Sequence, residues 1–172
     1  MVTSTSSKAC RKANPRKKTV KVRTYDSALR YLSNQTNYEQ MRRVKYNADT
    51  FDLDRMRTLL KKLGNPHKDI LAVHIAGTKG KGSTATMLAA MLGACGHKVG
   101  LYTSPHICDL RERIRINGTM ITQSALTKLI VKIQPLIEAM PDTKPTFFEI
   151  FTALALKHFH DEKVDIAVIE TG

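Results

Sequence analysis

The apolar positions of this chain form short continuous runs that alternate with longer segments of helical spacing. The short runs predict strands, and they lie at residues 70–75, 99–102 and 164–169. Apolar residues at helical spacing predict helices, near residues 28–32, 53–63, 83–95, 122–137 and 146–159. Strands that alternate with helices in this way predict an α/β fold whose doubly wound, mainly parallel sheet is flanked by helices.

Polar and turn residues mark several of these boundaries. Asp26 or Ser27 is a candidate cap for the first helix, and Thr122 is one for the helix at 122–137. The Asn-Gly pair at 117–118 predicts a tight hairpin turn. Pro135 predicts a kink or a restart within its helix, because proline lacks the N–H that helix hydrogen bonding requires.

The stretch 70–95, ILAVHIAGTKGKGSTATMLAAMLGAC, reads as a buried strand, a glycine-rich loop and a helix. Glycines let successive N–H groups face one anion, and the start of the helix adds partial positive charge, so the loop is of the P-loop type. Lys81 adds a full charge for the terminal phosphates of a nucleotide and is the predicted catalytic residue. The predicted nucleotide-binding residues are Gly77, Thr78, Lys79, Gly80, Lys81, Gly82 and Ser83.

This loop departs from the common pattern G-x-x-x-x-G-K-[ST] at two points. Only Thr78 and Lys79 separate its first two glycines, and Gly82 follows the lysine where Ser or Thr is usual. The alternative interpretation is a solvated, lysine-rich turn between a strand and a helix.

Two other predicted strands end in oxygen-bearing side chains. Ser104 follows the strand at 99–102, and Glu170 follows the strand at 164–169. The carboxyl ends of parallel strands meet at one edge of a sheet, so we expect both residues beside the glycine loop. A hydroxyl and a carboxylate there can hold Mg²⁺ together with phosphate oxygens and water. The alternative for Glu170 is a solvated acid in a turn.

Composition narrows the function classes. The sequence of 172 residues is 42% hydrophobic, and no apolar run approaches the ~18 residues that a membrane span needs. The formal net charge is +13, but residues 1–25 hold eight Lys or Arg and no acid. We therefore predict a basic, disordered arm over residues 1–24, with an organellar transit peptide as the alternative. The sequence does not indicate nucleic-acid binding, because no motif for it occurs and the aromatic residues are not interleaved with the basic run.

Two local predictions concern burial and compartment. The three cysteines are odd in number and lack metal-type spacing, which indicates a reducing compartment and a cytoplasmic protein. Cys95 lies in the apolar helix and is expected to be a small core residue. His74 lies within a predicted buried strand and is expected to be a packed core histidine.

Four segments, VHIAGTKGKGS, LYTSPHICDLRERIRING, PTFFEIFTALA and VIETG, resemble in their order the N-terminal domain of the folylpolyglutamate synthase and dihydrofolate synthase family, within the wider Mur ligase group. The resemblance covers roughly residues 25–172. It implies a monomeric ligase in which ATP phosphorylates a carboxylate of a folate-type substrate, dihydropteroate or tetrahydrofolate, and L-glutamate attacks the acyl phosphate. It also implies that Ser104 and Glu170 are ligands of Mg²⁺.

The resemblance also suggests residues near the substrate. His106, Arg111 and Arg113 lie in the segment that resembles the family's flexible loop beside the pterin-bearing substrate. Arginines in a loop are also often simply solvated. Glu149 matches the FE motif of the family, but Thr146-x-x-Glu149 is equally a helix capping box, and both interpretations remain open.

Members of the family continue beyond Glu-Thr-Gly with further strands and a second domain. We therefore expect residues 25–172 to be the N-terminal portion of an ATP-binding, Mur ligase-like domain that is truncated before the rest of its sheet. On that expectation the 172 residues alone would not add glutamate to a folate. The alternatives are a non-catalytic nucleotide-binding fragment and a Mur-type peptidoglycan ligase.

Overall fold

The computed structural model describes residues 21–37, 53–140 and 144–171. Its α-helices are α1 (Tyr25–Ser33), α2 (Leu53–Lys62), α3 (Lys81–Ala94), α4 (Gln123–Glu138) and α5 (Phe147–Asp161). Its strands are β1 (Ala72–Ile75), β2 (Val99–Tyr102), β3 (Ile114–Ile116), β4 (Thr119–Met120) and β5 (Ile166–Glu170). Two short 3₁₀ helices are η2 (Pro66–Asp69) and η3 (Leu110–Arg113).

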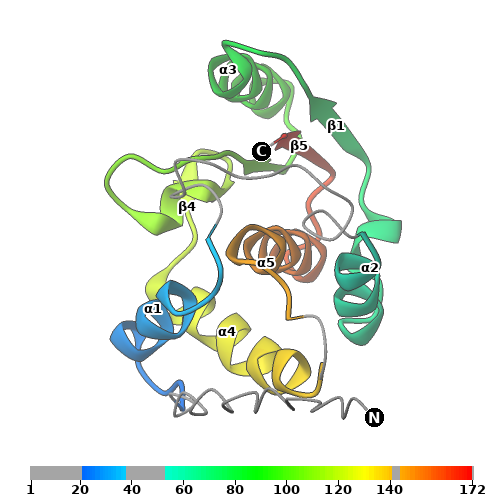
Figure 1. Ribbon diagram of the computed structural model, residues 1–172. Coiled ribbons are helices and arrows are strands. Elements are labelled where there is room, and N and C mark those ends of the chain that lie inside the picture. Colours follow the sequence, from blue (N-terminus) through cyan, green and yellow to red (C-terminus); the bar gives the residue numbers. More distant parts are fainter. Residues whose placement is uncertain (1–20, 38–52, 141–143, 172) are drawn as a thin grey trace, which may run out of the picture.

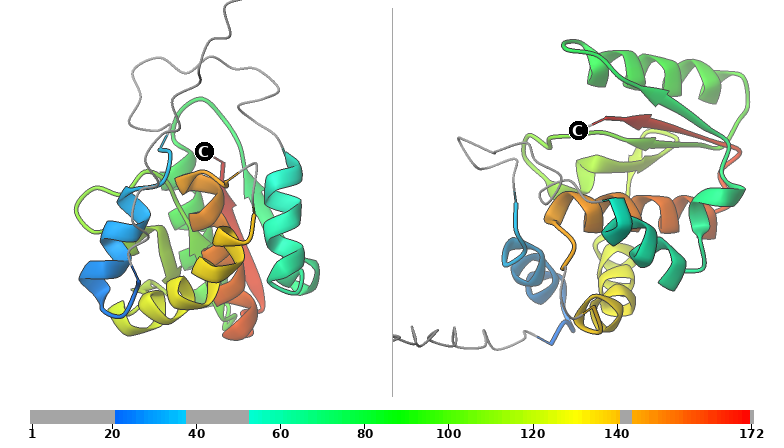
Figure 2. Two further views of the ribbon diagram at one scale, coloured as in Figure 1. Left: turned by 60° about the horizontal axis from the view of Figure 1, so that its bottom comes forward. Right: turned by 45° about the vertical axis from the view of Figure 1, so that its right-hand side comes forward.

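The strands form a five-stranded sheet in the order β1-β5-β2-β3-β4. β5 pairs in parallel with both β1 and β2, while the β3–β4 hairpin runs antiparallel to β2. Helix α3 covers one face, and α5 lies against the other with α1, α2 and α4 packed around it (Figures 1 and 2). The predicted α/β fold, with a mainly parallel sheet between helices, is confirmed.

The larger core lies on the α5 side of the sheet. Phe151 and Phe159 of α5 are fully buried, and burying a phenylalanine side chain stabilises a fold by about 1.5–3 kcal/mol. A Cβ atom built on Gly100 in β2 would lie only 2.8 Å from carbons of the Phe159 ring. Only glycine allows β2 to approach α5 this closely, so the helix is held tightly against the centre of the sheet.

The observed cap residues are the predicted ones at two helices, α4 and α5, and a different residue at α1. Thr122 caps α4 by accepting a hydrogen bond from the N–H of Ala125 at 3.1 Å, and Thr146 caps α5 in a capping box. The cap of α1 is Thr24, with Ser27 completing a capping box. The prediction of Asp26 or Ser27 as that cap is therefore wrong, because the helix begins at Tyr25.

The first strand is at an edge of the sheet instead of being buried. Among the described residues β1 pairs only with β5, so its residues alternate between exposed and half-buried. His74 is consequently exposed, and the prediction of a packed core histidine is wrong. An apolar run cannot distinguish an edge strand from a central one, because both positions favour the same residue types.

Two other predictions need correction on this part of the chain. Cys95 is exposed at the C-terminal cap of α3 and is not a core residue. Pro135 lies within α4, which continues to Glu138 without a restart, so only the kink stays a prediction. The hairpin at 117–118 is confirmed, with left-handed backbone at Asn117 (φ 46°) and Gly118 (φ 77°).

The predicted basic arm falls mostly outside the described residues, as does everything before residue 21. Of the residues predicted to belong to this arm, the structure describes residues 21–24, and one of them is buried. Val22 is buried, at 5% exposure, and its N–H donates to Oε1 of Gln134 at 3.2 Å. Val22 therefore packs against the fold, although the prediction assigns residues 1–24 to the arm. No described helix is both long enough and apolar enough to cross a membrane.

The buried hydroxyl of Tyr31 gives a test of the packing around α1. It has no hydrogen-bond partner among the described residues, and burial, assisted by the Glu138 carboxylate, raises the pKa of Tyr31 to about 12. Tyr31→Phe should leave the free energy of unfolding in urea unchanged or raise it by up to about 1 kcal/mol, because no hydrogen bond is lost.

The matched control is Tyr102→Phe. The Tyr102 hydroxyl lies 3.1 Å from Oγ1 of Thr152, so its removal should lower stability by about 0.5–1.5 kcal/mol. Equal losses in the two variants would contradict the assignment.

Candidate functional site

The glycine loop joins β1 to α3, as the sequence predicted, and α3 begins at Lys81. Gly80 is the N-terminal cap of α3 in a left-handed conformation, with φ of 75°, which glycine adopts without strain. The first turn of α3 contains no acidic residue. Its unpaired N–H groups and the helix dipole therefore present partial positive charge at the end of the loop.

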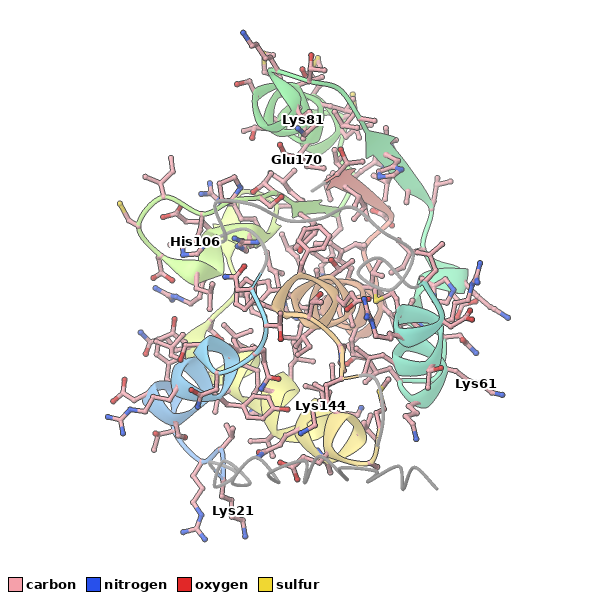
Figure 3. All side chains as sticks on the ribbon, in the orientation of Figure 1. Lys21, Lys61, Lys81, His106, Lys144 and Glu170 are labelled. Carbon is pink, nitrogen blue, oxygen red and sulfur yellow. The ribbon has the colours of Figure 1, made fainter. Side chains whose placement is uncertain are left out.

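Lys81 stands at this end of the helix and is half-buried. A Cβ built on Gly77 would lie 3.8 Å from Cγ of Lys81, so the lysine stem crosses close to the beginning of the loop. Thr78, Lys79 and Ser83 are exposed. Figure 3 shows Lys81 and Glu170 labelled together beside α3.

Glu170 is the last residue of β5 and is buried, at 6% exposure. Its Oε2 accepts a hydrogen bond from the N–H of Ser104 at 3.0 Å. A Cβ built on Gly82 would lie 3.3 Å from Oε2 and 3.4 Å from Oε1 of Glu170. The carboxylate thus lies against the first turn of α3, and the alternative of a solvated acid in a turn is wrong.

This contact explains one of the two departures of the loop from the common phosphate-loop pattern, the glycine that follows Lys81. The position after Lys81 faces the Glu170 carboxylate, and a Ser or Thr side chain there would have to displace it. Gly82 leaves that space to the acid. The predicted proximity of Ser104, Glu170 and the glycine loop is confirmed, whereas their roles toward metal and nucleotide stay predictions.

The donor set at this edge of the sheet suits a hard cation that is shared with a phosphate. It includes the carboxylate of Glu170 and the residue Ser104, whose N–H donates to that carboxylate and whose side chain carries a hydroxyl. No group of three or more His, Cys, Asp or Glu gathers anywhere in the described segments, so the described residues form no all-protein metal cage. Mg²⁺ characteristically takes one or two protein oxygens and fills its octahedron with phosphate oxygens and water. The residues present therefore fit magnesium.

The segment after Ser104 is ordered by an acid that sequence analysis missed. The carboxylate of Glu112 accepts main-chain N–H bonds from Ile107, Cys108 and Asp109, at 2.9, 3.1 and 2.8 Å. These bonds lower the pKa of Glu112. Asp109 and Glu112 also form the capping box of η3. Their D-x-x-E spacing is the signal in the sequence that could have identified this role.

The two candidate substrate arginines of this segment have protein partners. Arg111 forms an ion pair with Asp109, in which Nη2 of Arg111 lies 2.6 Å from Oδ2 of Asp109. Hydrogen bonds from Arg111 lower the pKa of the Asp109 carboxyl. Arg113 is 1% exposed, and its Nε donates to Nδ1 of His106 at 3.1 Å. The interpretation of Arg113 as a solvated loop residue is therefore wrong.

Glu149 forms the helix capping box with Thr146 that the spacing of the two residues predicted. Its Oε2 accepts the N–H of Thr146 at 2.7 Å, and Oγ1 of Thr146 accepts the N–H of Glu149 at 3.2 Å. Oε1 of Glu149 also lies 3.3 Å from Nε of Arg55, in an ion pair that joins α5 to α2. The capping-box interpretation is confirmed, and a contact with substrate stays a prediction.

Two cavities adjoin these elements. A cavity of about 470 Å³ lies between α1 and the 105–113 segment, and its lining includes Tyr25, Leu29, His106, Leu110 and Phe147. A second, of about 230 Å³, lies beside the end of β5, and its lining includes His74, Tyr102, Phe148, Thr152 and Glu170. Of the four predicted substrate residues, His106 lines the larger cavity.

The sequence is similar to folylpolyglutamate synthases and related bifunctional proteins of an archaeon and a bacterium. It is 50% identical over 121 residues to a probable bifunctional folylpolyglutamate synthase/dihydropteroate synthase of Haloferax volcanii, a match that covers 69% of this chain and 14% of the relative. It is 44% identical over 124 residues to the dihydrofolate synthase/folylpolyglutamate synthase of Bacillus subtilis, which covers 70% and 29%. No protein-family model matches the chain.

Solved structures agree with these matches. The folylpolyglutamate synthase of Thermotoga maritima superposes with a TM-score of 0.75 at 39% identity over 86% of this chain. A folylpolyglutamate synthase complex with AMPPCP and folate superposes with a TM-score of 0.76 at 37% identity over 87%. The chain spans only 33% and 35% of the length of these two proteins.

The superpositions extend over 86% and 87% of the chain. The chain is therefore similar in sequence and in its Mur ligase fold to the N-terminal region of folylpolyglutamate and dihydrofolate synthases.

Proposed function

We propose that residues 77–83 bind the phosphates of ATP and that Ser104 and Glu170 hold Mg²⁺ beside them. The activity that this site would serve is the addition of L-glutamate to a folate-type substrate, dihydropteroate or tetrahydrofolate. One observation carries the proposal: the buried carboxylate of Glu170 lies against the first turn of the helix that follows the glycine loop. The related complex with AMPPCP and folate supports the choice of ligands.

The residues of the loop would act mainly by charge stabilisation. The loop N–H groups and Lys81 would stabilise the charge that moves onto the γ-phosphoryl oxygens while the substrate carboxylate attacks phosphorus. ADP leaves, and an acyl phosphate remains. The amine of L-glutamate would then attack the acyl carbon and displace phosphate, which forms the amide. A bound Mg²⁺ supplies neutralising charge for the phosphate oxygens.

For the folate-type substrate we propose the larger cavity, where His106 contributes a polar group to a mostly apolar wall. Substrate contacts by Arg111, Arg113 and Glu149 stay predictions, because each of these side chains already has a protein partner. The cytoplasmic location and the monomeric state also stay predictions.

A non-catalytic nucleotide-binding module is the second candidate, because the chain spans about a third of the length of its solved relatives. The discriminating assay incubates the protein with ATP, Mg²⁺, labelled L-glutamate and either dihydropteroate or tetrahydrofolate. A labelled folate product would establish the ligase and would overturn the expectation that these 172 residues alone add no glutamate. Nucleotide binding without product is the result expected for these residues alone, and it would leave nucleotide binding as their activity.

Removing the Lys81 charge tests the nucleotide site itself. Lys81→Ala should weaken AMPPCP binding about tenfold to a hundredfold, because one charge-assisted phosphate contact is worth about 1.5–3 kcal/mol. Isothermal titration calorimetry measures the change. Lys128→Ala removes an exposed charge on α4 and should bind as the unaltered protein does. Unchanged affinity in Lys81→Ala would remove the basis for a phosphate site.

The space at Gly82 provides a test that separates stability from binding. Gly82→Ala should stabilise α3 by up to about 1 kcal/mol through helix propensity, yet its methyl group would crowd the Glu170 carboxylate. We therefore expect a smaller gain in AMPPCP affinity on adding Mg²⁺, while the two effects on stability oppose each other in the melting temperature.

Gly93→Ala is the matched control, because it lies in the same helix and a Cβ there meets nothing within 4 Å. It should raise the melting temperature and keep the full magnesium effect. If Gly82→Ala also keeps the full gain in AMPPCP affinity on adding Mg²⁺, the position of the Glu170 carboxylate beside residue 82 does not matter for magnesium binding.

A further inference from the structure

The short segment 103–106, which carries Ser104, is held on both sides by a single residue. The carbonyl oxygen of Arg113 accepts the N–H of Thr103 at 3.2 Å. The Nε of the same arginine donates to Nδ1 of His106 at 3.1 Å. Ser104 lies between these two attachment points, and its own N–H donates to Glu170.

Arg113 is itself fixed in the core. Its side chain is 1% exposed, and its guanidinium carbon lies 5.3 Å from the ring centroid of Phe147 and 5.7 Å from that of Phe151. A planar guanidinium is attracted to the faces of aromatic rings, so α5 restrains the orientation of the arginine. The next residue, Ile114, pairs with Tyr102 across the sheet. Arg113 thus connects segment 103–106 to both a helix and a strand.

The bond to His106 has a defined direction. The Nε–H of arginine can only donate, so Nδ1 of His106 must accept. When the imidazole is neutral, its proton is then on Nε2. His106 is therefore held in one tautomer and one ring orientation by the buried arginine.

We propose that Arg113 is a positioning residue that acts through Thr103 and His106 to hold Ser104 beside Glu170. This proposal rests on the function proposed above for Ser104 and Glu170 as ligands of Mg²⁺. It gives Arg113 a role that differs from a direct contact with a substrate carboxylate. Two hydrogen bonds that bracket Ser104 limit the movement of its main chain, so the oxygen donors are arranged before the metal and nucleotide arrive.

The experiment compares three single variants and the double variant of Arg113→Met with His106→Ala. Arg113→Met removes the charge and the donor but keeps most of the buried volume. His106→Ala removes the acceptor together with the rest of a half-buried imidazole ring and leaves Arg113 in place. Arg115→Met is the matched control, because Arg115 lies two residues further on, in β3, and its Nε donates to the carbonyl of Glu112 at 3.2 Å.

For each variant, AMPPCP affinity is measured with Mg²⁺ and with EDTA. In Arg113→Met and His106→Ala, the ratio of the two affinities should fall towards one, while the affinity in EDTA stays within about twofold of the unaltered protein. The effects should not add in the double variant, because both residues act on the same segment. Arg115→Met should keep the original ratio.

A spectroscopic readout reports on the arginine–histidine contact directly. Long-range ¹H–¹⁵N spectra of the His106 ring, recorded well above the ordinary imidazole pKa of about 6.5, should show the Nε2–H tautomer in the unaltered protein. Arg113→Met should give a mixture of tautomers, which a mere loss of fold stability would not produce.

The outcomes are decisive in each case. Folded Arg113→Met and His106→Ala proteins that retain the full magnesium effect would overturn the positioning role, although the metal site would stand. If Arg113→Met does not fold, His106→Ala decides alone. If the unaltered protein gains no affinity from Mg²⁺, the proposed metal site fails and the role of Arg113 fails with it.

Discussion

The arrangement of this site depends on the contact between the buried carboxylate of Glu170 and the first turn of α3. Removing a carboxylate from water costs free energy unless hydrogen bonds and positive charge compensate it. Here the N–H of Ser104 donates to it, and the N-terminal end of α3 lies against it. The contact requires that β5 lie between β1 and β2. It also requires glycine at residue 82, because a side chain there would enter the space of the carboxylate. The sheet order and the glycine loop therefore serve one geometry.

Helix α5 fixes much of what surrounds that carboxylate. Its first turn is held by the capping box of Thr146 and Glu149, and an ion pair from Glu149 to Arg55 ties it to α2. The same turn supplies the Phe147 ring beside the Arg113 guanidinium. Towards its other end, Phe159 packs against β2 where Gly100 leaves room. Because the helix is anchored along its length, segment 103–106 rests on packed elements and not on a free loop.

The sequence predicted the site well where the signal was local. An apolar run, closely spaced glycines and an apolar helix sufficed to place residues 77–83 between β1 and α3. The shared edge of parallel strands sufficed to bring Ser104 and Glu170 together. Features that depend on distant partners could not be predicted. The edge position of β1, the buried attachment of Val22 to Gln134 and the aromatic surroundings of Arg113 each involve residues far apart in the chain.

We propose Glu170 and Ser104 as one half of a metal site whose other half is nucleotide phosphate. The most direct measurement of this site is anomalous diffraction from crystals grown with AMPPCP and Mn²⁺ in place of Mg²⁺. We expect a metal peak within about 2.0–2.3 Å of a Glu170 carboxylate oxygen and of the Ser104 hydroxyl, with phosphate oxygens completing the shell. A nucleotide whose metal lies away from both side chains, or a Glu170 carboxylate that still faces only Ser104 and Gly82, would contradict it.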